Sequence, residues 1–408
     1  MRTAATFRAF TGAHLLSRGF RPFFLGAGLF ALVAIAVWPA VFLGEVILPT
    51  AFSAVEWHAH EMLFGYGAAV IAGFLLTAIP NWTGRLPVAG TALGSLALLW
   101  FAGRAAVLVS ARIGWATAAV IDVAFLVVFA LVVAREIAAG KNWRNLKVIA
   151  VVGLLASANL AFHLEAHFTG DTDHAGRAAL ALIVFLILLF GGRVVPSFTG
   201  NWLARRGEAK RPAPFDRRDA YALALSALAL VAWIAFPNKD LTGLALLAAG
   251  LASLARLARW RGWRTFADPL VLVLHGAFLL VALGFLAAGA SALMPNQVPP
   301  AIGLHIWAIG GIGGMTLAMM TRATLGHSGQ TLAATPGTIA VYLLVAASLV
   351  ARIAMALLPQ WTVLFMLVAA FCWCSAFAGF VIIYWPMLAR RGGDRSKLGH
   401  TPEPHIRL

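Results

Sequence analysis

The sequence predicts an all-α polytopic membrane protein with about 12 transmembrane helices. Three observations support this fold class. Of the 408 residues, 61% are hydrophobic and 11% are charged, whereas a soluble domain has about 25% charged residues. The mean hydropathy is +0.87. Apolar runs of the length that crosses a bilayer, roughly 20 residues at about 1.5 Å each, recur along the chain.

Proline, glycine and charged residues divide the chain into twelve apolar segments. The expected spans are 22–43, 57–80, 89–110, 113–134, 147–168, 177–198, 219–237, 241–258, 268–290, 299–321, 337–358 and 361–389. The seventh and eighth are separated only by the short polar segment 237–240. We expect one transmembrane domain over 1–408, with two six-span halves joined by a cytoplasmic linker at 204–219 and with no soluble domain.

The basic residues fall mainly on one side of the predicted membrane. With both termini in the cytoplasm, most of the 31 lysines and arginines lie on the inner side. The outer ones are Arg104, Arg112, Arg177, Lys239 and Arg352. This split follows the positive-inside rule and favours an even number of spans. It explains the net charge of +16 by topology next to a lipid bilayer, so no nucleic-acid partner is expected.

Cysteine chemistry contributes nothing to the predicted site. The two cysteines, Cys372 and Cys374, are two residues apart on one predicted helix. Their side chains therefore point to opposite sides and cannot bond to each other. We expect neither a disulfide framework nor a thiolate metal site.

A short pattern recurs at the predicted inner ends of spans 2, 6 and 10. The sequence PNWTG at 80–84 resembles PSFTG at 196–200, and TRAT occupies the corresponding place at 321–324. Recurrence at every fourth span would suit three pseudo-repeated four-helix units. Three short matches can also arise by chance.

Histidines are the candidate metal ligands. Three spans carry histidines at a similar depth near the predicted outer side, and these are His58, His60, His163 and His305. His275, in the inner third of the ninth span, is a further candidate. Imidazole binds haem iron, copper and zinc, and a neutral imidazole avoids most of the desolvation penalty. The alternative for each is a hydrogen-bonded core or interfacial residue.

Helix geometry limits the second span. Because successive residues turn by about 100°, His58 and Glu61 share one face, while His60 points about 200° away from His58. Only one of these histidines can then face a given site unless the helix is broken. We expect His60 to join partners from spans 5 and 10. Glu61 is either a proton relay or a hydrogen-bonding partner of a ligating histidine.

Two arginines mark the predicted inner side. Arg21 opens the first span beside aromatic residues, and Arg322 lies near the end of the tenth. Arginines at such positions commonly bind lipid headgroups. The alternative is that Arg21 and Arg322 hold an anionic group, such as a haem propionate or a substrate. No basic phosphate loop follows the glycine-rich stretch 310–314, so a nucleotide site is not expected.

The sequence resembles the NnrS family over nearly its whole length. The matching pieces are GFRPFFL at 19–25, WHAHEM at 57–62, GFLLTAIPNWTG at 73–84, GGRVVPSFTGNWL at 191–203 and HIWAIGGIGGMTLAMMTRATLGHSG at 305–329. The resemblance implies a bacterial inner-membrane protein that carries haem b and copper, associated with the nitric oxide response and denitrification. It implies ligand roles for the motif histidines His58, His60, His305 and His327, with Arg322 beside the last. His163 and His275 are weaker candidates.

These observations together favour a haem- and copper-binding membrane protein that handles nitric oxide, by reducing or sequestering it, to relieve nitrosative stress. Nitric oxide would be a ligand or a substrate, and reduction would require an electron donor that the sequence does not identify. One alternative is a transporter of a metal complex or small anion, in which the histidines bind protons or substrate. Another is a sensor that binds haem without catalysis.

Overall fold

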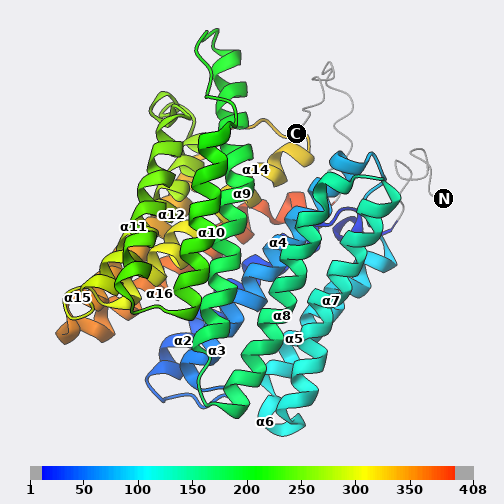
Figure 1. Cartoon of the computed structure of the whole chain (residues 1–408). Coiled ribbons are helices and arrows are strands. Elements are labelled where there is room, and N and C mark those ends of the chain that lie inside the picture. The colour runs from blue at the N-terminus through cyan, green and yellow to red at the C-terminus, as the bar shows by residue number, and fades with distance from the viewer. Residues whose placement is uncertain (1–11, 391–408) are drawn as a thin grey trace.

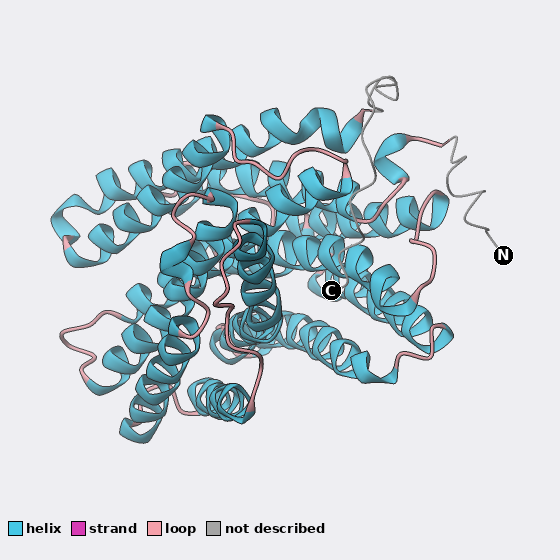
Figure 2. Ribbon diagram, turned by 90° about the horizontal axis from the view of Figure 1, so that it is seen from above, coloured by secondary structure: helices cyan, strands magenta, loops and turns pink. Residues whose placement is uncertain are grey.

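A computed structural model describes residues 12–390, which form helices and connecting loops without any strand (Figures 1 and 2). Residues 1–11 and 391–408 lie outside the described part. Several basic residues counted in the predicted charge pattern fall there, namely Arg2, Arg8, Arg391, Arg395, Lys397 and Arg407. The all-α fold class is confirmed for the described residues.

Twelve helical segments of the described chain are long and apolar enough to cross a membrane, as predicted. Ten of these spans contain one principal helix. The first nine are α2 Phe20–Phe42, α5 Thr91–Leu108, α7 Trp115–Ala139, α8 Leu146–Phe168, α9 Asp173–Arg205, α10 Arg217–Ala235, α11 Asp240–Ala258, α12 Pro269–Leu293 and α15 Pro336–Leu357. The last is α16 Thr362–Ala389, and a short helix, α6 Ser110–Ile113, joins α5 to α7. The chain is a multi-pass membrane protein.

Local capping explains several of the helix boundaries. The weak break at 237–240 is real, because α10 ends at Ala235 and α11 begins at Asp240. α10 begins with a capping box, in which the Asp216 side chain accepts hydrogen bonds from the backbone of Arg218 and Asp219. Such a box satisfies backbone N–H groups that a helix start leaves unpaired.

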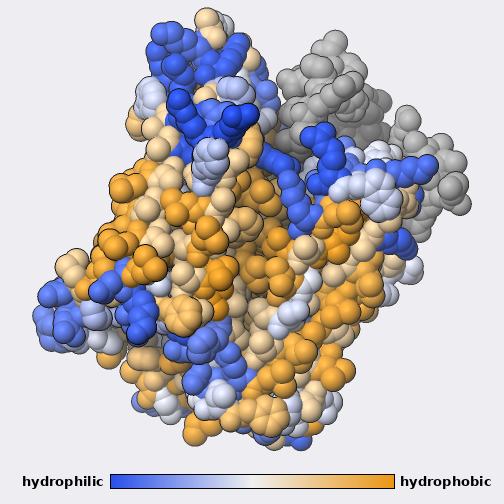
Figure 3. Space-filling view, in the orientation of Figure 1, coloured by the Kyte–Doolittle hydropathy of each residue, from blue (hydrophilic) through white to orange (hydrophobic). Residues whose placement is uncertain are grey.

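The spans pack around a central group of helices. In Figure 1, α5, α7 and α8 lie on the right and α11 and α12 on the left, and α2 packs against α16. Arg21, in the first turn of α2, donates a 2.6 Å hydrogen bond to the Met387 carbonyl near the end of α16. The first helix therefore begins where the last one ends, as an even number of spans requires. Hydrophobic side chains cover most of the visible face between hydrophilic ends (Figure 3).

The second and tenth spans are not regular α-helices. The second runs as α3 Ala54–His60, a π-helical segment η2 Glu61–Gly67, and α4 Ala68–Thr83. The tenth runs as α13 Pro300–His305, a π-helical segment η5 Ile306–Gly313, and α14 Gly314–His327. π-helical turns are rare and frequently mark functional sites. Here each one starts directly after a candidate ligand, His60 or His305.

Glycines let neighbouring helices approach these π-helical segments closely. A Cβ added to Gly65 in η2 would lie 2.5 Å from Phe30, and one added to Gly313 in η5 would lie 2.8 Å from Trp373. Only residues without a Cβ fit at these contacts. Phe30 of α2 and Trp373 of α16 fill the space beside these glycines, so α2 packs closely on η2 and α16 packs closely on η5.

Candidate metal-binding sites

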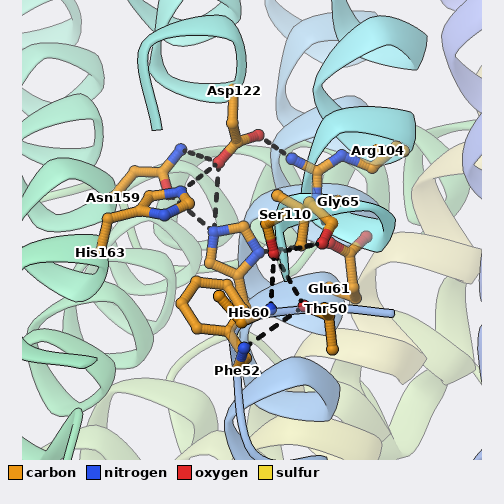
Figure 4. A network of polar contacts seen from close by, with 12 residues as sticks. Thr50, Phe52, His60, Glu61, Gly65, Arg104, Ser110, Asp122, Asn159 and His163 are labelled. Carbon is orange, nitrogen blue, oxygen red and sulfur yellow. Dashed lines mark hydrogen bonds and ion pairs between the residues drawn. The ribbon is translucent and has the colours of Figure 1, made fainter. Parts of the chain in front are cut away.

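A network of polar side chains lies buried between α3, η2, α5, α7 and α8 (Figure 4). Every member is at most 6% exposed, and the members are His60, Glu61, Arg104, Asp122, Asn159 and His163. We call this group the His60 network. Ionisable groups inside membrane-spanning segments are costly and usually mark functional sites.

Asp122, in α7, lies at the centre of the His60 network. Its Oδ2 atom accepts a 2.9 Å hydrogen bond from Asn159 and lies 3.1 Å from Nε2 of both His60 and His163. Its Oδ1 atom accepts a hydrogen bond from Arg104. His60, Asp122 and His163 offer ligand atoms that all lie within 4.8 Å of one another. Two imidazoles and a carboxylate are a donor set suited to copper or zinc.

Glu61 adds a second carboxylate beside the same guanidinium. Its Oε1 atom accepts a 2.7 Å hydrogen bond from Arg104 and lies 3.3 Å from Nδ1 of His60. Its Oε2 atom is buried and has no hydrogen-bond partner among the described residues. With neutral histidines, two carboxylates and one guanidinium leave the His60 network with one negative charge. Buried charges are normally balanced, so a metal cation or an imidazolium would complete the network.

A second site is a cavity of about 240 Å³ bounded mainly by α2, α3, η2, α13, η5, α15 and α16. His58 and His305 both line it, together with Tyr66 and Arg352. His58 stacks on Trp38 with ring centroids 4.2 Å apart. We call this space the His58–His305 cavity.

The His305 ring is oriented for ligation. Its Nδ1 atom donates a 2.8 Å hydrogen bond to the Ala301 carbonyl one turn earlier in α13. A hydrogen bond of this kind fixes the tautomer and leaves the Nε2 lone pair available. His305 could therefore offer Nε2 as a metal ligand at the cavity wall.

The comparison with known proteins identifies the family. The family described as NnrS protein matches residues 14–391. The chain belongs to the NnrS family. The matched region contains the whole His60 network and the whole His58–His305 cavity. No curated protein matches the chain.

In this NnrS family member, the two histidines of the second span face different sites. His60 meets His163 of span 5 in the network, whereas His305 of span 10 lines the cavity with His58. The expectation that His60 would join span 10 is therefore wrong. The reason is that α3 is a regular helix through His60, so the two side chains point in nearly opposite directions.

Glu61 also differs from its expected placement. Regular geometry put it on the face of His58, but its carboxylate contacts His60 and Arg104. Glu61 is the first residue of η2, where α-helical spacing no longer applies. The attraction of the Arg104 guanidinium holds the carboxylate on the network side.

The other candidate histidines of this NnrS family member belong to neither site. His275, in α12, has its Nε2 atom 2.7 Å from the Thr199 hydroxyl, and its buried Nδ1 atom has no partner among the described residues. His327 ends α14, with its Nδ1 atom 3.4 Å from Nη1 of Arg18. Neither His275 nor His327 lines the His58–His305 cavity.

The two arginines considered as an anion clamp have different partners. Arg21 donates hydrogen bonds to His14 and to the Met387 carbonyl. Arg322 lies over the Phe198 ring, with its guanidinium carbon 4.1 Å from the ring centroid. Neither arginine lines the His58–His305 cavity. The cation on the wall of that cavity is Arg352.

Four contributors to the sites were not among the candidates, namely Arg104, Asp122, Asn159 and Arg352. Asp122 carried the clearest signal, because it is an acidic residue inside the apolar run of the fourth span. For Arg104 and Arg352, the sequence predicts only a place on the outer side of the membrane. Their burial depends on how the helices rotate against each other.

Proposed function

We propose that this NnrS family member is a haem- and copper-binding protein of the bacterial inner membrane that handles nitric oxide. Membership of the family suggests a role in the nitric oxide response. The observation that carries the proposal is the division of four histidines of the membrane spans into two sites, one a polar network and the other an open cavity. Two sites of different chemistry suit two different metal centres.

Haem is assigned to the His58–His305 cavity. Histidines project from two helices, and Arg352 offers a positive charge for a propionate. Pockets for drug-sized ligands hold roughly 300–1,000 Å³, and the cavity of about 240 Å³ is smaller. Its wall includes Met62, Met355 and Met366, whose flexible side chains can move aside. Haem iron with an open coordination position binds diatomic ligands.

Copper is assigned to the His60 network. The nitrogen and oxygen donors of His60, Asp122 and His163 match the ligand types of copper. Arg104 donates a hydrogen bond to Oδ1 of Asp122, the carboxylate oxygen that does not face the two histidines. Such outer partners orient metal ligands and are important for affinity.

A lateral apolar groove offers a route for a small neutral molecule such as nitric oxide. This groove, of about 90 Å³, lies between α4, α9, η5 and α14. It shares Ile183 and Ile312 with the wall of the His58–His305 cavity. A molecule dissolved in the bilayer core would meet apolar side chains along this way to the cavity.

We expect protein purified from haem-supplied cells to show a Soret absorption band and to contain copper by elemental analysis. Nitric oxide should shift the Soret band, because it would bind the iron. Consumption of nitric oxide with an added chemical reductant, in place of the biological electron donor, would identify an enzyme. Binding without consumption would identify a sensor. Absence of a Soret band would refute the haem proposal and favour the transporter.

Replacing Glu61 by glutamine is expected to slow any proton-coupled turnover of nitric oxide about tenfold or more, as for loss of a positioned proton-transfer group. Glu61 does not line the His58–His305 cavity. A proton relayed through Glu61 would therefore pass through the His60 network. Haem content should stay unchanged. The measurement is the rate of nitric oxide consumption at several pH values, and equal rates for both proteins would reject the relay.

The orientation is also proposed. Both termini are placed in the cytoplasm, because α2 begins and α16 ends at the same end of the bundle and the cytoplasmic ends of membrane proteins are rich in arginine and lysine.

A further inference from the structure

A polar pocket lies at one end of the bundle, where it is lined by the end of α9, the last two turns of α14, the start of α12 and the segment 332–334. We propose that it binds a phosphate-type anion, either a phospholipid headgroup or free phosphate. The pocket has a volume of about 340 Å³. Its charged lining residues are Arg205, Arg206, Arg322 and Asp268, and we call it the Arg322 pocket.

Arg322 is the deepest cation of the pocket and forms no direct ion pair among the described residues, although Asp268 in the lining exerts a Coulombic attraction on it. Its side chain is buried, with 6% of the residue exposed. Across residues 12–390 it makes no hydrogen bond or ion pair, and its buried Nη1 atom has no partner. The Phe198 ring beneath it supplies a cation–π contact at 4.1 Å. A ring face does not satisfy the N–H donors, so the guanidinium has free hydrogen-bonding capacity.

Two other buried arginines of the described chain have the direct carboxylate partners that Arg322 lacks. Arg104 is held by Glu61 and Asp122, and Arg256 is held by Asp219 at 3.0 Å. Burying a charge without a directly paired counter-charge is unfavourable. An anion that enters the Arg322 pocket would provide negative charge and hydrogen-bond acceptors to Arg322, as Glu61 and Asp122 do to Arg104.

The rim of the pocket adds positive charge. Arg205 and Arg206 are exposed at the end of α9, and Arg206 lies over the Trp202 ring at 4.8 Å. The one acidic lining residue, Asp268, accepts a 3.0 Å hydrogen bond from the Leu270 backbone as the cap of α12. Three arginines against one aspartate leave the lining positively charged.

Phosphate is the anion that this set fits best. Guanidinium groups bind phosphate oxygens in a planar, paired geometry, and here they converge from α9 and α14 on one space. Basic pockets between membrane-spanning helices at the cytoplasmic side bind phospholipid headgroups. The site does not depend on the proposed metals, because Arg322 does not line the His58–His305 cavity.

The test uses the full chain in nanodiscs of phosphatidylcholine, which has no net charge. In one arm, inorganic phosphate is titrated and the thermal unfolding midpoint is followed. In the other arm, a fraction of phosphatidylglycerol replaces phosphatidylcholine. We expect stabilisation in at least one arm, with an apparent affinity that falls about tenfold or more in Arg322→Gln, since a hydrogen bond to a charged group contributes roughly that much. Arg217→Gln, an exposed arginine on α10, is the matched control and should behave as the unchanged protein.

The two arms identify the source of the anion. Stabilisation by inorganic phosphate that Arg322→Gln weakens assigns free phosphate, and stabilisation by phosphatidylglycerol alone assigns a lipid headgroup. No stabilisation in either arm, or equal stabilisation of Arg322→Gln and the unchanged protein, would overturn the proposal. If Arg322→Gln does not fold, the exposed pair Arg205→Gln and Arg206→Gln replaces it. That double variant should lower the affinity several-fold, and an unaltered affinity would count against the site.

Discussion

Replacing His305 by alanine is expected to remove haem from the purified protein. The His305 ring lines the cavity and has its Nδ1 atom tied to the Ala301 carbonyl, so that Nε2 is the free donor. Losing only an outer partner of a ligand commonly costs 10–100-fold in metal affinity, and losing the ligand itself should cost at least as much. The Soret absorbance relative to protein should therefore fall about tenfold or more.

The control for His305→Ala is His275→Ala, which lies outside the cavity and should keep the Soret band. Copper content should be unchanged in His305→Ala, because the donors of the His60 network come from α3, α7 and α8. An unchanged spectrum in His305→Ala would refute the ligand role. Loss of both metals would mean that the two sites are not independent.

Replacing Arg104 by leucine is expected to destabilise the fold by about 3–5 kcal/mol. The change leaves the carboxylates of Glu61 and Asp122 buried together without the guanidinium that joins them. A buried ion pair broken at one partner typically costs this much, because the other charge remains without compensation. Denaturant unfolding in a mild detergent measures the difference in the free energy of unfolding.

Arg112→Leu is the matched control, because Arg112 is an exposed arginine close in sequence at the end of α6. Its effect should stay within about 0.5 kcal/mol, as for most surface substitutions. The double variant Arg104→Leu/Glu61→Gln should recover part of the loss, since one uncompensated carboxylate is gone. If Arg104→Leu unfolds at the same denaturant concentration as the unchanged protein, the ion pairs do not stabilise the fold.

The number and places of the spans could be predicted because they depend on local composition. A run of apolar residues must form a helix in the bilayer, since each backbone N–H and C=O group needs a partner inside the segment. Even the weak break at 237–240 was sufficient to separate α10 from α11. The division into four-helix units stays a prediction.

The grouping of the site residues could be predicted only in part, because it depends on rotation about each helix axis. Depth placed His60 near His163, and the structure brings them together. Depth also placed His305 at the same level, but the side chain points into another space. The partners Asp122 and Asn159 come from α7 and α8, and no local pattern in one helix reports which neighbour it will face.

The irregular turns of the second and tenth spans have a consequence for how the two spans can change. In an uninterrupted helix, one inserted residue rotates every later side chain by about 100°. The wide turns of η2 and η5 take up such an extra residue locally. The helix before each π-helical segment ends at His60 or His305, and the helix after it is α4 or α14. The two helices can therefore differ in rotation about the helix axis. Ligand direction at one end and helix packing at the other can vary without disturbing each other.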